Sequence, residues 1–483
     1  MLIIIIVLLC FCLFAEFLQL ISIMKLLTGY ILFFFITLNL TDGFCQRLNS
    51  GPHKQEQSSP NTLDARIVQW QKDLNIPNVA IGIIENNKLV KAKVYGNLSD
   101  GKPAPKNMIF EVASISKVVF STMVLKLVQE GKWDLDEPLA HYFVDTAVAS
   151  DPYSKKITTR HVLSQQSGFD NWRWMNSTGK LRFNFEPGTK FNYSGEGMEY
   201  LKSAIEQKFH KSLPQLADSV LFKPLHLSDT HHEWDGKTDF ARHSRMYDTE
   251  GKQITKTDYS IRASAAAGVT TTIEDLSKFA IEVLKGGHLS AGLNKEIIKT
   301  QAVISPNLQQ GLGWRVVNGL PNHEYALLHA GNDQGVAAIM VLLPKSKRGI
   351  IVLTNADNGL MMCNNIVRAA LAEGPEIIHK AYKSTKLTEV LPVISLTDSV
   401  LKTYAGNYKR EDGEPVTVTL KDRGLVLKMA GIPVLNLLPE AEDKFFLMDL
   451  DVKIFFTKND DGTVNAVSIQ DGGNVIKCMK VNP

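Results

Sequence analysis

Hydrophobic and polar positions follow two different periods along the chain, and together they predict both strands and helices. Two β-rich runs, Val79–Glu85 and Leu89–Tyr95, lie on either side of an Asn-Asn pair, an arrangement typical of a β-hairpin. The apolar stretch Val118–Val128 ends shortly before Gly131, and its length and composition indicate a buried helix.

The same two patterns continue downstream. In chain order we expect helices near 196–208, 213–222 and 273–285, strands at Tyr325–His329, Gly335–Leu343 and Gly349–Thr354, and helical structure at 363–383. Strands at both ends with helices between them describe an α+β unit. The pattern therefore predicts a domain over residues 63–385, an antiparallel sheet flanked by helices with an inserted helical region.

A second, smaller domain is expected at residues 398–483. Asp, Gly and Asn turns there separate short alternating segments at Pro415–Leu420, Gly424–Met429, Lys444–Asp449, Val452–Thr457 and Val464–Ile469. This spacing is typical of a small antiparallel sandwich or barrel, so the second domain is predicted to be all-β.

The N-terminal region has the composition of a targeting segment. Residues 2–24 are almost wholly apolar, and a second apolar run follows. Read from Met24, the sequence has the charged, apolar and small-residue regions of a signal peptide, with cleavage near Cys45. A membrane anchor is the main alternative, because an apolar run of about 20 residues can span a bilayer; lipidation at Cys45 is another. We expect a targeting segment at 1–45, a polar linker at 46–62, and an exported protein that is periplasmic or membrane-anchored.

Composition and charge restrict the class of protein. The 483 residues are 44% hydrophobic and 21% charged, which excludes a disordered or low-complexity chain. Lys and Arg minus Asp and Glu gives 53 − 50 = +3, without a basic block, so we expect no nucleic-acid partner.

Cysteine and histidine give no sign of a metal site or a disulfide framework. Outside the targeting segment only Cys363 and Cys478 remain, and we expect two buried free thiols. The run from His231 to Asp235 is rich in possible ligands, but neighbours on one element point in different directions and chelate poorly. We expect a solvated loop there, and no metal or organic cofactor.

Nucleophilic chemistry is indicated by a Ser-x-x-Lys pattern. Its five matches begin at Ser22, Ser99, Ser114, Ser177 and Ser399. Only Ser114 stands where a strand-like run meets the long buried helix, so its backbone N–H lies at the positive end of the helix dipole. Lys117 lies on the same helical face and can reach the Ser114 hydroxyl, and burial favours its neutral, basic form. The alternative is an ordinary N-cap serine followed by a lysine that extends to the surface.

Several further segments match the motifs of one family in the family's order. They are Phe110–Lys117, Glu130–Leu139, Arg160–Gly168, Phe185–Gly188 with Tyr193, Gly311–Trp314 and His329–Gly331. Over roughly residues 63–357 the chain resembles the serine β-lactamase/penicillin-binding-protein superfamily, specifically its class C-like group. That group also contains D-alanyl-D-alanine carboxypeptidases, D-aminopeptidases and esterases. The resemblance implies a β-lactamase/transpeptidase-like fold, and the C-terminal part resembles the β-rich domain that many exported members carry.

The resemblance also implies roles for particular residues. Ser114 would be the acyl-accepting nucleophile, Lys117 its base partner and Tyr193 a second proton shuttle. His329 would hydrogen-bond Tyr193 or bind a substrate carboxylate.

Substrate binding would involve the strand after His329 and the residues after Tyr193. Gly331 would let the substrate approach that strand closely, and the backbone N–H of Asn332 would complete an oxyanion hole with that of Ser114. Gly195 stands where the family's Tyr-x-Asn motif has the Asn that grips the acyl-amide of the substrate.

Other positions also depart from the family's motifs. Gln165 stands where the family has His, and His329 stands where β-lactamases have Lys, a change familiar among carboxypeptidase- and esterase-like members. Together with Gly195, the change at His329 weakens the case for an efficient β-lactamase and leaves acyl transfer intact.

The sequence thus predicts an exported serine hydrolase that cleaves an amide or ester bond. Its substrate would be a small molecule or peptide: a D-amino-acid peptide, an ester or a β-lactam. Three alternatives stay open. They are a carboxypeptidase of cell-wall peptides that penicillin acylates, a non-catalytic penicillin- or peptide-binding sensor, and a surface-binding protein that works through the β-rich domain.

Overall fold

The computed structural model describes residues 62–98, 101–176, 178–256, 259–382, 394, 396–421, 424–429, 435–447, 452–471 and 474–481. These residues form two compact units, a larger one that ends at residue 382 and a smaller one that begins at residue 394. The predicted targeting segment at 1–45, and all of the predicted linker except Thr62, lie outside the described residues.

The larger unit is built around an eight-stranded sheet in which every neighbouring pair is antiparallel. From one edge to the other the strands are β2 (Lys88–Gly96), β1 (Asn78–Glu85), β10 (Arg348–Thr354), β9 (Val336–Leu343), β8 (Ala326–Asp333), β7 (Arg315–Val317), β6 (Leu308–Gln310) and β5 (Ala302–Ser305). The predicted antiparallel sheet is therefore confirmed. The three short strands β5, β6 and β7 were not indicated by the sequence pattern.

Strands from the beginning and from near the end of the larger unit are neighbours in this sheet. β1 pairs with β10, with Val79 opposite Thr354. Beside that pair the buried side chain of Asn355 accepts a hydrogen bond from the backbone of Asn78 and donates one to its side chain, both at 2.9 Å. The predicted hairpin links β1 to β2 through an Asn-Asn turn in which both residues have positive φ, as a two-residue type I′ turn requires.

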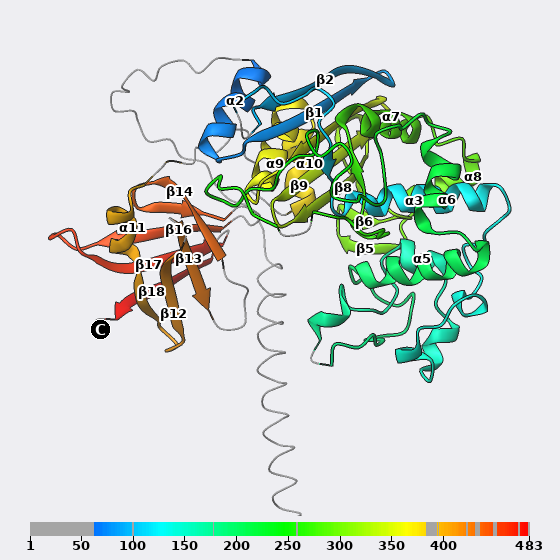
Figure 1. Ribbon diagram of the computed structural model, residues 1–483. Helices are drawn as coiled ribbons and strands as arrows, with labels where there is room; N and C mark the ends of the chain where they lie inside the picture. The colour runs from blue at the N-terminus through cyan, green and yellow to red at the C-terminus, as the bar shows by residue number, and fades with distance from the viewer. Residues whose placement is uncertain are drawn as a thin grey trace, which may run out of the picture. The chain divides into compact units, whose positions relative to one another are not determined.

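Helices cover both faces of the sheet (Figure 1). One face carries α2 (Leu63–Asp73), α9 (Gly359–Ala370) and α10 (Gly374–Tyr382), and the other carries α3 (Ile115–Gln129) and α7 (Ile273–Leu284). Every residue of β9 is buried, as expected for a strand that is covered on both sides. α3 is the predicted buried helix, and it places its first turn beside β8.

The expected inserted helical region lies between α3 and α7 in the chain. It contains α4 (Thr159–Leu163), α5 (Gly195–Phe209) and α6 (Leu213–Ala217), the last of which continues as a π-helical turn. A two-stranded sheet, β3 (Phe110–Glu111) with β4 (Thr270–Thr271), connects the segment before α3 to the segment before α7.

The smaller unit is a closed eight-stranded barrel, so the all-β prediction is confirmed. It begins with α11 (Asp398–Tyr404), and its strands are β11 (Gly406–Arg410), β12 (Pro415–Lys421), β13 (Gly424–Met429), β14 (Leu435–Ala441), β15 (Lys444–Phe446), β16 (Val452–Lys458), β17 (Val464–Asp471) and β18 (Asn474–Val481). The ring closes because β11 pairs with β18. The aromatic rings of Tyr404, Phe445 and Phe456 contact one another in its core, with centroids 4.5–5.7 Å apart.

Cys363 and Cys478 are free and buried, as predicted. In the described part of the chain, no group of three or more His, Cys, Asp or Glu side chains is placed to hold a metal ion. None of the helices within the ranges given above combines the length and the apolar composition of a membrane span.

The prediction of a solvated loop at His231–Asp235 is wrong for the even-numbered residues. His231 bridges to Thr270 in strand-like backbone, so successive side chains point to opposite sides. The ring of His232 is therefore buried and stacks on Phe222, whereas the side chains on either side of it are exposed. Burial lowers the pKa of His232 to about 3.

Candidate active site

Ser114 lies in the turn that joins β3 to α3. It immediately precedes the first helical residue, and its side chain makes no capping hydrogen bond, so the hydroxyl is not used to begin the helix. The preceding residue, Ala113, has φ of 43°, a left-handed conformation that costs a residue with a Cβ about 1–2 kcal/mol. The Ser116 hydroxyl fixes this turn, since it donates to the Ala113 carbonyl at 2.6 Å and accepts from the Val269 amide at 2.9 Å.

Lys117 is buried one turn into α3, with only 2% of its surface exposed. Its Nζ donates to Ser114 Oγ at 3.0 Å and to the backbone carbonyl of Ala266 at 2.9 Å. The sequence spacing placed Lys117 within reach of Ser114, and the structure contains that contact. The Ala266 carbonyl adds a second fixed point that orients the side chain.

Tyr193 lies on the other side of Lys117. The lysine Nζ is 4.8 Å from the centroid of the half-buried Tyr193 ring. The centroids of the Tyr193 and His329 rings are 6.4 Å apart. The four residues predicted from the sequence as catalytic, Ser114, Lys117, Tyr193 and His329, are thus brought together from α3, the residues before α5 and β8.

His329 is buried, and its Nδ1 lies 2.9 Å from the Ala330 carbonyl. The predicted hydrogen bond to Tyr193 is not among the contacts of the described residues. Burial, with the positive charges of Arg315 and Lys117 nearby, lowers the pKa of His329 to about 3. The imidazole is therefore neutral near pH 7, and it offers no positive charge to a substrate carboxylate.

Gly331 brings β8 against the turn that carries Ser114. A Cβ added at Gly331 would stand 2.2 Å from the Val112 carbonyl oxygen and 2.9 Å from the Ser114 backbone nitrogen. Only a glycine allows this approach of β8 to the turn. The expected close approach of a substrate to the strand at Gly331 stays a prediction. Asn332, the next residue, is exposed at the end of the strand and is opposite Ala337 of β9.

Gln165, which replaces the family's His, positions the segment that carries Tyr193. Its side-chain carbonyl accepts from the Ser194 amide at 2.7 Å, and its backbone carbonyl accepts from the Asn192 amide at 2.8 Å. Gln165 itself has φ of 57° and is buried. The backbone on both sides of Tyr193 is therefore bonded to one residue.

Gly195 follows in the first turn of α5, and an indole occupies the space beside it. A Cβ at this position would lie 2.7 Å from two ring atoms of Trp172. The space into which an asparagine side chain would project is thus taken by the Trp172 ring. The glycine in place of the asparagine of Tyr-x-Asn is therefore accompanied by a tryptophan beside it.

The loop that carries the Ala266 carbonyl is attached to α5 through Glu199. One carboxylate oxygen accepts from the Ser264 hydroxyl at 2.6 Å and from the Ala266 amide at 3.1 Å. The other pairs with Lys202, 2.5 Å away. Glu199 therefore fixes the acceptor that orients Lys117.

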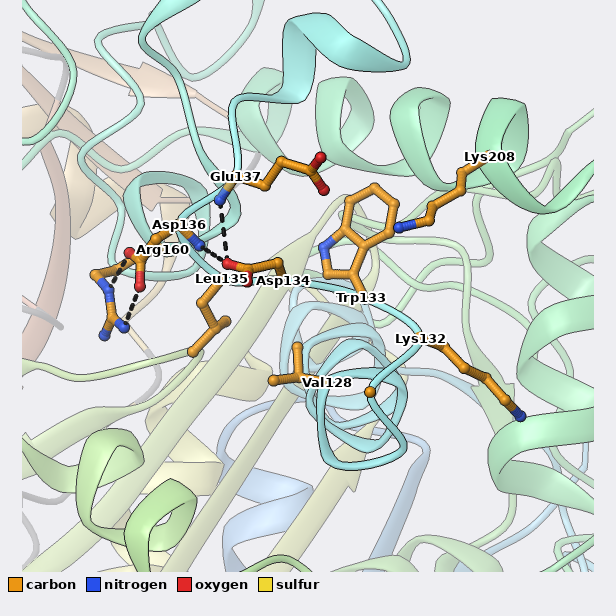
Figure 2. A pocket seen from close by; sticks show the side chains of 10 residues that line it. Val128, Lys132, Trp133, Asp134, Leu135, Asp136, Glu137, Arg160 and Lys208 are labelled. Carbon is orange, nitrogen blue, oxygen red and sulfur yellow. Dashed lines mark hydrogen bonds and ion pairs between the residues drawn. The ribbon is translucent and has the colours of Figure 1, made fainter.

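A cleft of about 540 Å³ lies elsewhere, beyond the C-terminal end of α3 (Figure 2). Lys208 lies over the ring of Trp133, Arg160 pairs with Asp136, and Asp134 accepts from two backbone amides. Because these polar groups bond one another, they serve to order the segment after α3. None of the residues predicted from the sequence as catalytic or substrate-binding lines this cleft.

The remaining Ser-x-x-Lys matches do not form a second site in the part that the structure describes. Ser399 lies in α11, where its hydroxyl contacts Thr397 at 2.8 Å. Ser22, Ser99 and Ser177 lie outside the described residues.

Comparison with known families agrees with this arrangement. The sequence model named Beta-lactamase matches residues 63–373, which is well over half of the chain. The chain belongs to the β-lactamase family. A second model, a domain of unknown function (DUF3471), matches residues 392–478, where the structure has the barrel.

Individual relatives of this β-lactamase-family chain are distant. It is 22% identical over 415 residues to penicillin-binding protein 4* of Bacillus subtilis, covering 78% of this chain and 89% of that one. The octameric penicillin-binding protein homologue from Pyrococcus abyssi superposes with a TM-score of 0.57 at 18% identity, over 86% of this chain and 99% of that one. The D-alanine carboxypeptidase AmpC from Burkholderia cenocepacia gives 0.53 at 20% identity, over 64% and 98%. These structures share the β-lactamase/transpeptidase fold.

Sequence reasoning missed two residues that shape the site of this family member, Glu199 and Trp172, and it gave no role to a third, Gln165. Glu199 gave no signal, because a glutamate in an amphipathic helix is ordinary. Trp172 lies in a loop without a motif. Gln165 was noticed only as a departure from the family's His, and its position in a matching motif was the one available signal.

Proposed function

We propose that this β-lactamase-family protein is an exported serine hydrolase that cleaves an ester or amide bond through an acyl-enzyme on Ser114. The observation that carries the proposal is the contact of 3.0 Å between Lys117 Nζ and Ser114 Oγ at the start of a buried helix. A nucleophile and its base need this geometry before any other condition.

In the acylation step Lys117 acts as the base and takes the proton from Ser114 Oγ while the oxygen attacks the carbonyl carbon. The bond to the leaving group then breaks, and Tyr193 delivers a proton to the departing oxygen or nitrogen. Tyr193 regains a proton from Lys117, whose Nζ lies over its ring. Water then attacks the acyl-enzyme, the same groups remove its proton, and the acid product leaves as Ser114 is restored.

The negative charge on the carbonyl oxygen needs donors at a fixed place. We assign these to the backbone N–H groups of Ser114 and of Asn332, which follows Gly331 on β8. The close approach of β8 to the Ser114 nitrogen supports this assignment. His329 contributes a neutral ring beside Tyr193 and excludes water from that side.

The substrate would be a D-amino-acid peptide, an ester or a β-lactam. The second candidate is a penicillin-binding carboxypeptidase of cell-wall peptides, or a sensor that stops at the acyl-enzyme. The relation to a named penicillin-binding protein over 78% of the chain favours this candidate. The N-terminal 45 residues would act either as a signal peptide that is cleaved off or as an anchor that is retained. The mass of the mature protein's N-terminal peptide distinguishes the two.

The test is covalent labelling of the full chain with a fluorophosphonate and, separately, with a fluorescent penicillin, followed by peptide mapping. We expect fluorophosphonate on Ser114, with no labelling of Ser114→Ala. Ser399→Ala is the matched control, because it alters a Ser-x-x-Lys match in the other unit. Penicillin labelling with turnover would identify a β-lactamase, and labelling without turnover the penicillin-binding candidate. A wild-type chain that neither reagent labels would refute the proposal.

A further inference from the structure

The loop Asp170–Met175, which we call the aromatic loop, lies against the first turn of α5, directly after Tyr193. We propose that this loop is the acyl-binding wall of the site and that the substrate carries an apolar acyl group. The inference rests on the proposed function and adds the substrate class. It concerns the part of the substrate that stays on Ser114 in the acyl-enzyme.

The position of Trp172 connects the loop to the site. Its six-membered ring stands 2.7 Å from where a Cβ of Gly195 would be. Gly195 is two residues from Tyr193, a separation of at most about 7 Å between Cα atoms. Tyr193 in turn contacts Lys117, so the indole borders the group of residues around Ser114.

The backbone of the loop is fixed to the start of α5 by three hydrogen bonds. The Ser194 hydroxyl donates to the Asp170 carbonyl at 2.8 Å, and the Gly195 amide donates to Asn171 Oδ1 at 2.9 Å. The Glu196 amide donates to the Asn171 carbonyl at 3.0 Å. The indole that follows Asn171 is therefore held at a set place.

The two charged side chains of the loop pair with groups outside it, Asp170 with Arg182 at 3.6 Å and Arg173 with two carboxylates. Arg173 binds the largely buried carboxylate of Glu196 through its side chain and its backbone amide, at 2.9–3.1 Å, and also reaches Asp145 at 3.1 Å. Hydrogen bonding to Glu196 raises the pKa of Arg173. Because both charges already have partners, we infer that the apolar side chains of the loop, rather than a free charge, meet an incoming substrate.

Two exposed apolar side chains follow Arg173 in the same loop. Trp174 is 71% exposed and Met175 59% exposed, which ranks them first and third among the exposed large hydrophobic side chains in the described part of the larger unit. They follow the half-buried Trp172 in one short 3-10 turn. We infer that an acyl chain long enough to pass the indole would reach these exposed side chains.

This surface favours one substrate chemistry over another. An acylamido group, as in penicillins and peptides, needs hydrogen-bond partners for its amide, and an indole face supplies none. An alkyl or aryl acyl group gains from burial against an aromatic ring. The occupant we infer is therefore the acyl chain of an ester or amide of an apolar carboxylic acid.

The experiment compares kcat/KM for the nitrophenyl esters of acetate, butyrate and octanoate. Each methylene that is fully buried is expected to raise kcat/KM about fourfold, so partial burial gives a clear rise along the series. We expect the octanoate-to-acetate ratio to fall at least tenfold in Trp172→Ala. In Trp174→Ala/Met175→Ala we expect kcat/KM to fall for the octanoate ester and to stay nearly unchanged for the butyrate ester. Val68→Ala, which removes an exposed apolar side chain from α2, is the control and leaves the ratio unchanged.

A second comparison tests the geometry at Gly195. Gly195→Asn alone collides with the indole, whereas Trp172→Ala/Gly195→Asn has room for the amide. We expect the double variant to be labelled by fluorescent penicillin at least tenfold faster than Trp172→Ala, and to unfold at a higher urea concentration than Gly195→Asn.

The outcomes separate the inference from the proposed function. A flat ester series, or an unchanged ratio in folded variants that fluorophosphonate still labels at Ser114, overturns the inference and leaves the hydrolase proposal intact. A wild-type chain without labelling at Ser114 and without ester turnover refutes both. A steep series that becomes flat in the Trp172 variant supports the acyl-binding wall.

Discussion

Gly331→Ala tests how closely β8 must approach the nucleophile. The added Cβ would lie 2.2 Å from the Val112 carbonyl oxygen, whereas contacts with a Cβ rarely fall below 3.0–3.4 Å. Strand and turn must therefore separate by about 1 Å, and the obstacle is backbone, which cannot rotate away as a side chain can. A misplacement of about 1 Å can lower a rate 100-fold. Overpacking of this kind costs about 1–3 kcal/mol of stability.

We therefore expect kcat/KM for an activated ester, and the rate of fluorophosphonate labelling of Ser114, to fall about 100-fold in Gly331→Ala. The control is Gly349→Ala on β10, where a Cβ would meet a leucine methyl at 2.8 Å and a backbone oxygen at 3.1 Å. That variant should lose some stability in urea unfolding, though less than Gly331→Ala because the leucine methyl can move aside, and it should retain its rate. If Gly331→Ala folds and stays within threefold of the wild-type rate, then the spacing between β8 and the turn does not set the reactivity of Ser114.

Three other changes test separate contacts. Tyr193→Phe should lower the acylation rate constant by about 10²–10⁴ in rapid-mixing experiments, and a loss below tenfold would contradict proton transfer by the phenol. Glu199→Ala frees the loop that orients Lys117 and should lower kcat about 10–100-fold. Glu199→Gln keeps one acceptor oxygen and should lower kcat less. Equal losses of kcat in the two variants would argue that Glu199 does not position this loop through its hydrogen bonds. The folded pKa of His329, about 3, lies below the unfolded value of 6.5, so the unfolded chain binds a proton first and stability falls as the pH drops from 6.5 towards 3. His329→Asn should make this decline less steep in urea unfolding across that range, and an unchanged slope would show that the imidazole is not buried as a neutral ring.

The sequence pattern predicted the elements that have strong local signals. The β1–β2 hairpin follows from an Asn-Asn pair that tolerates positive φ, and α3 follows from a long apolar run. The short strands β5, β6 and β7 have three or four residues each, too few for a period to be recognised. β8 continues four residues beyond the predicted end at His329, because Gly331 is required by a close approach and does not end the strand.

The candidate site was predictable where one element carries both partners. Ser114 and Lys117 are three residues apart on a helix, so their contact follows from helical geometry. The Ala266 carbonyl that also binds Lys117 is a backbone group 149 positions away. Because every residue has a backbone carbonyl, the sequence could not indicate which one Lys117 would bind. The indole beside Gly195 likewise depends on a loop whose path is fixed by long-range hydrogen bonds, which no local pattern contains.

The pairing of β1 with β10 has a consequence for the order of events during synthesis. Asn78 and Asn355 are 277 positions apart, and ribosomes add about 5–20 residues per second, so β1 waits roughly 14–55 s for its partner. Throughout that time the β1–β2 hairpin has an unpaired edge, which is a template for aggregation. The hairpin must therefore stay protected from other chains until β10 emerges. A chain cut short before β10 loses the neighbour of its first strand and, with it, the sheet that places β8 beside Ser114.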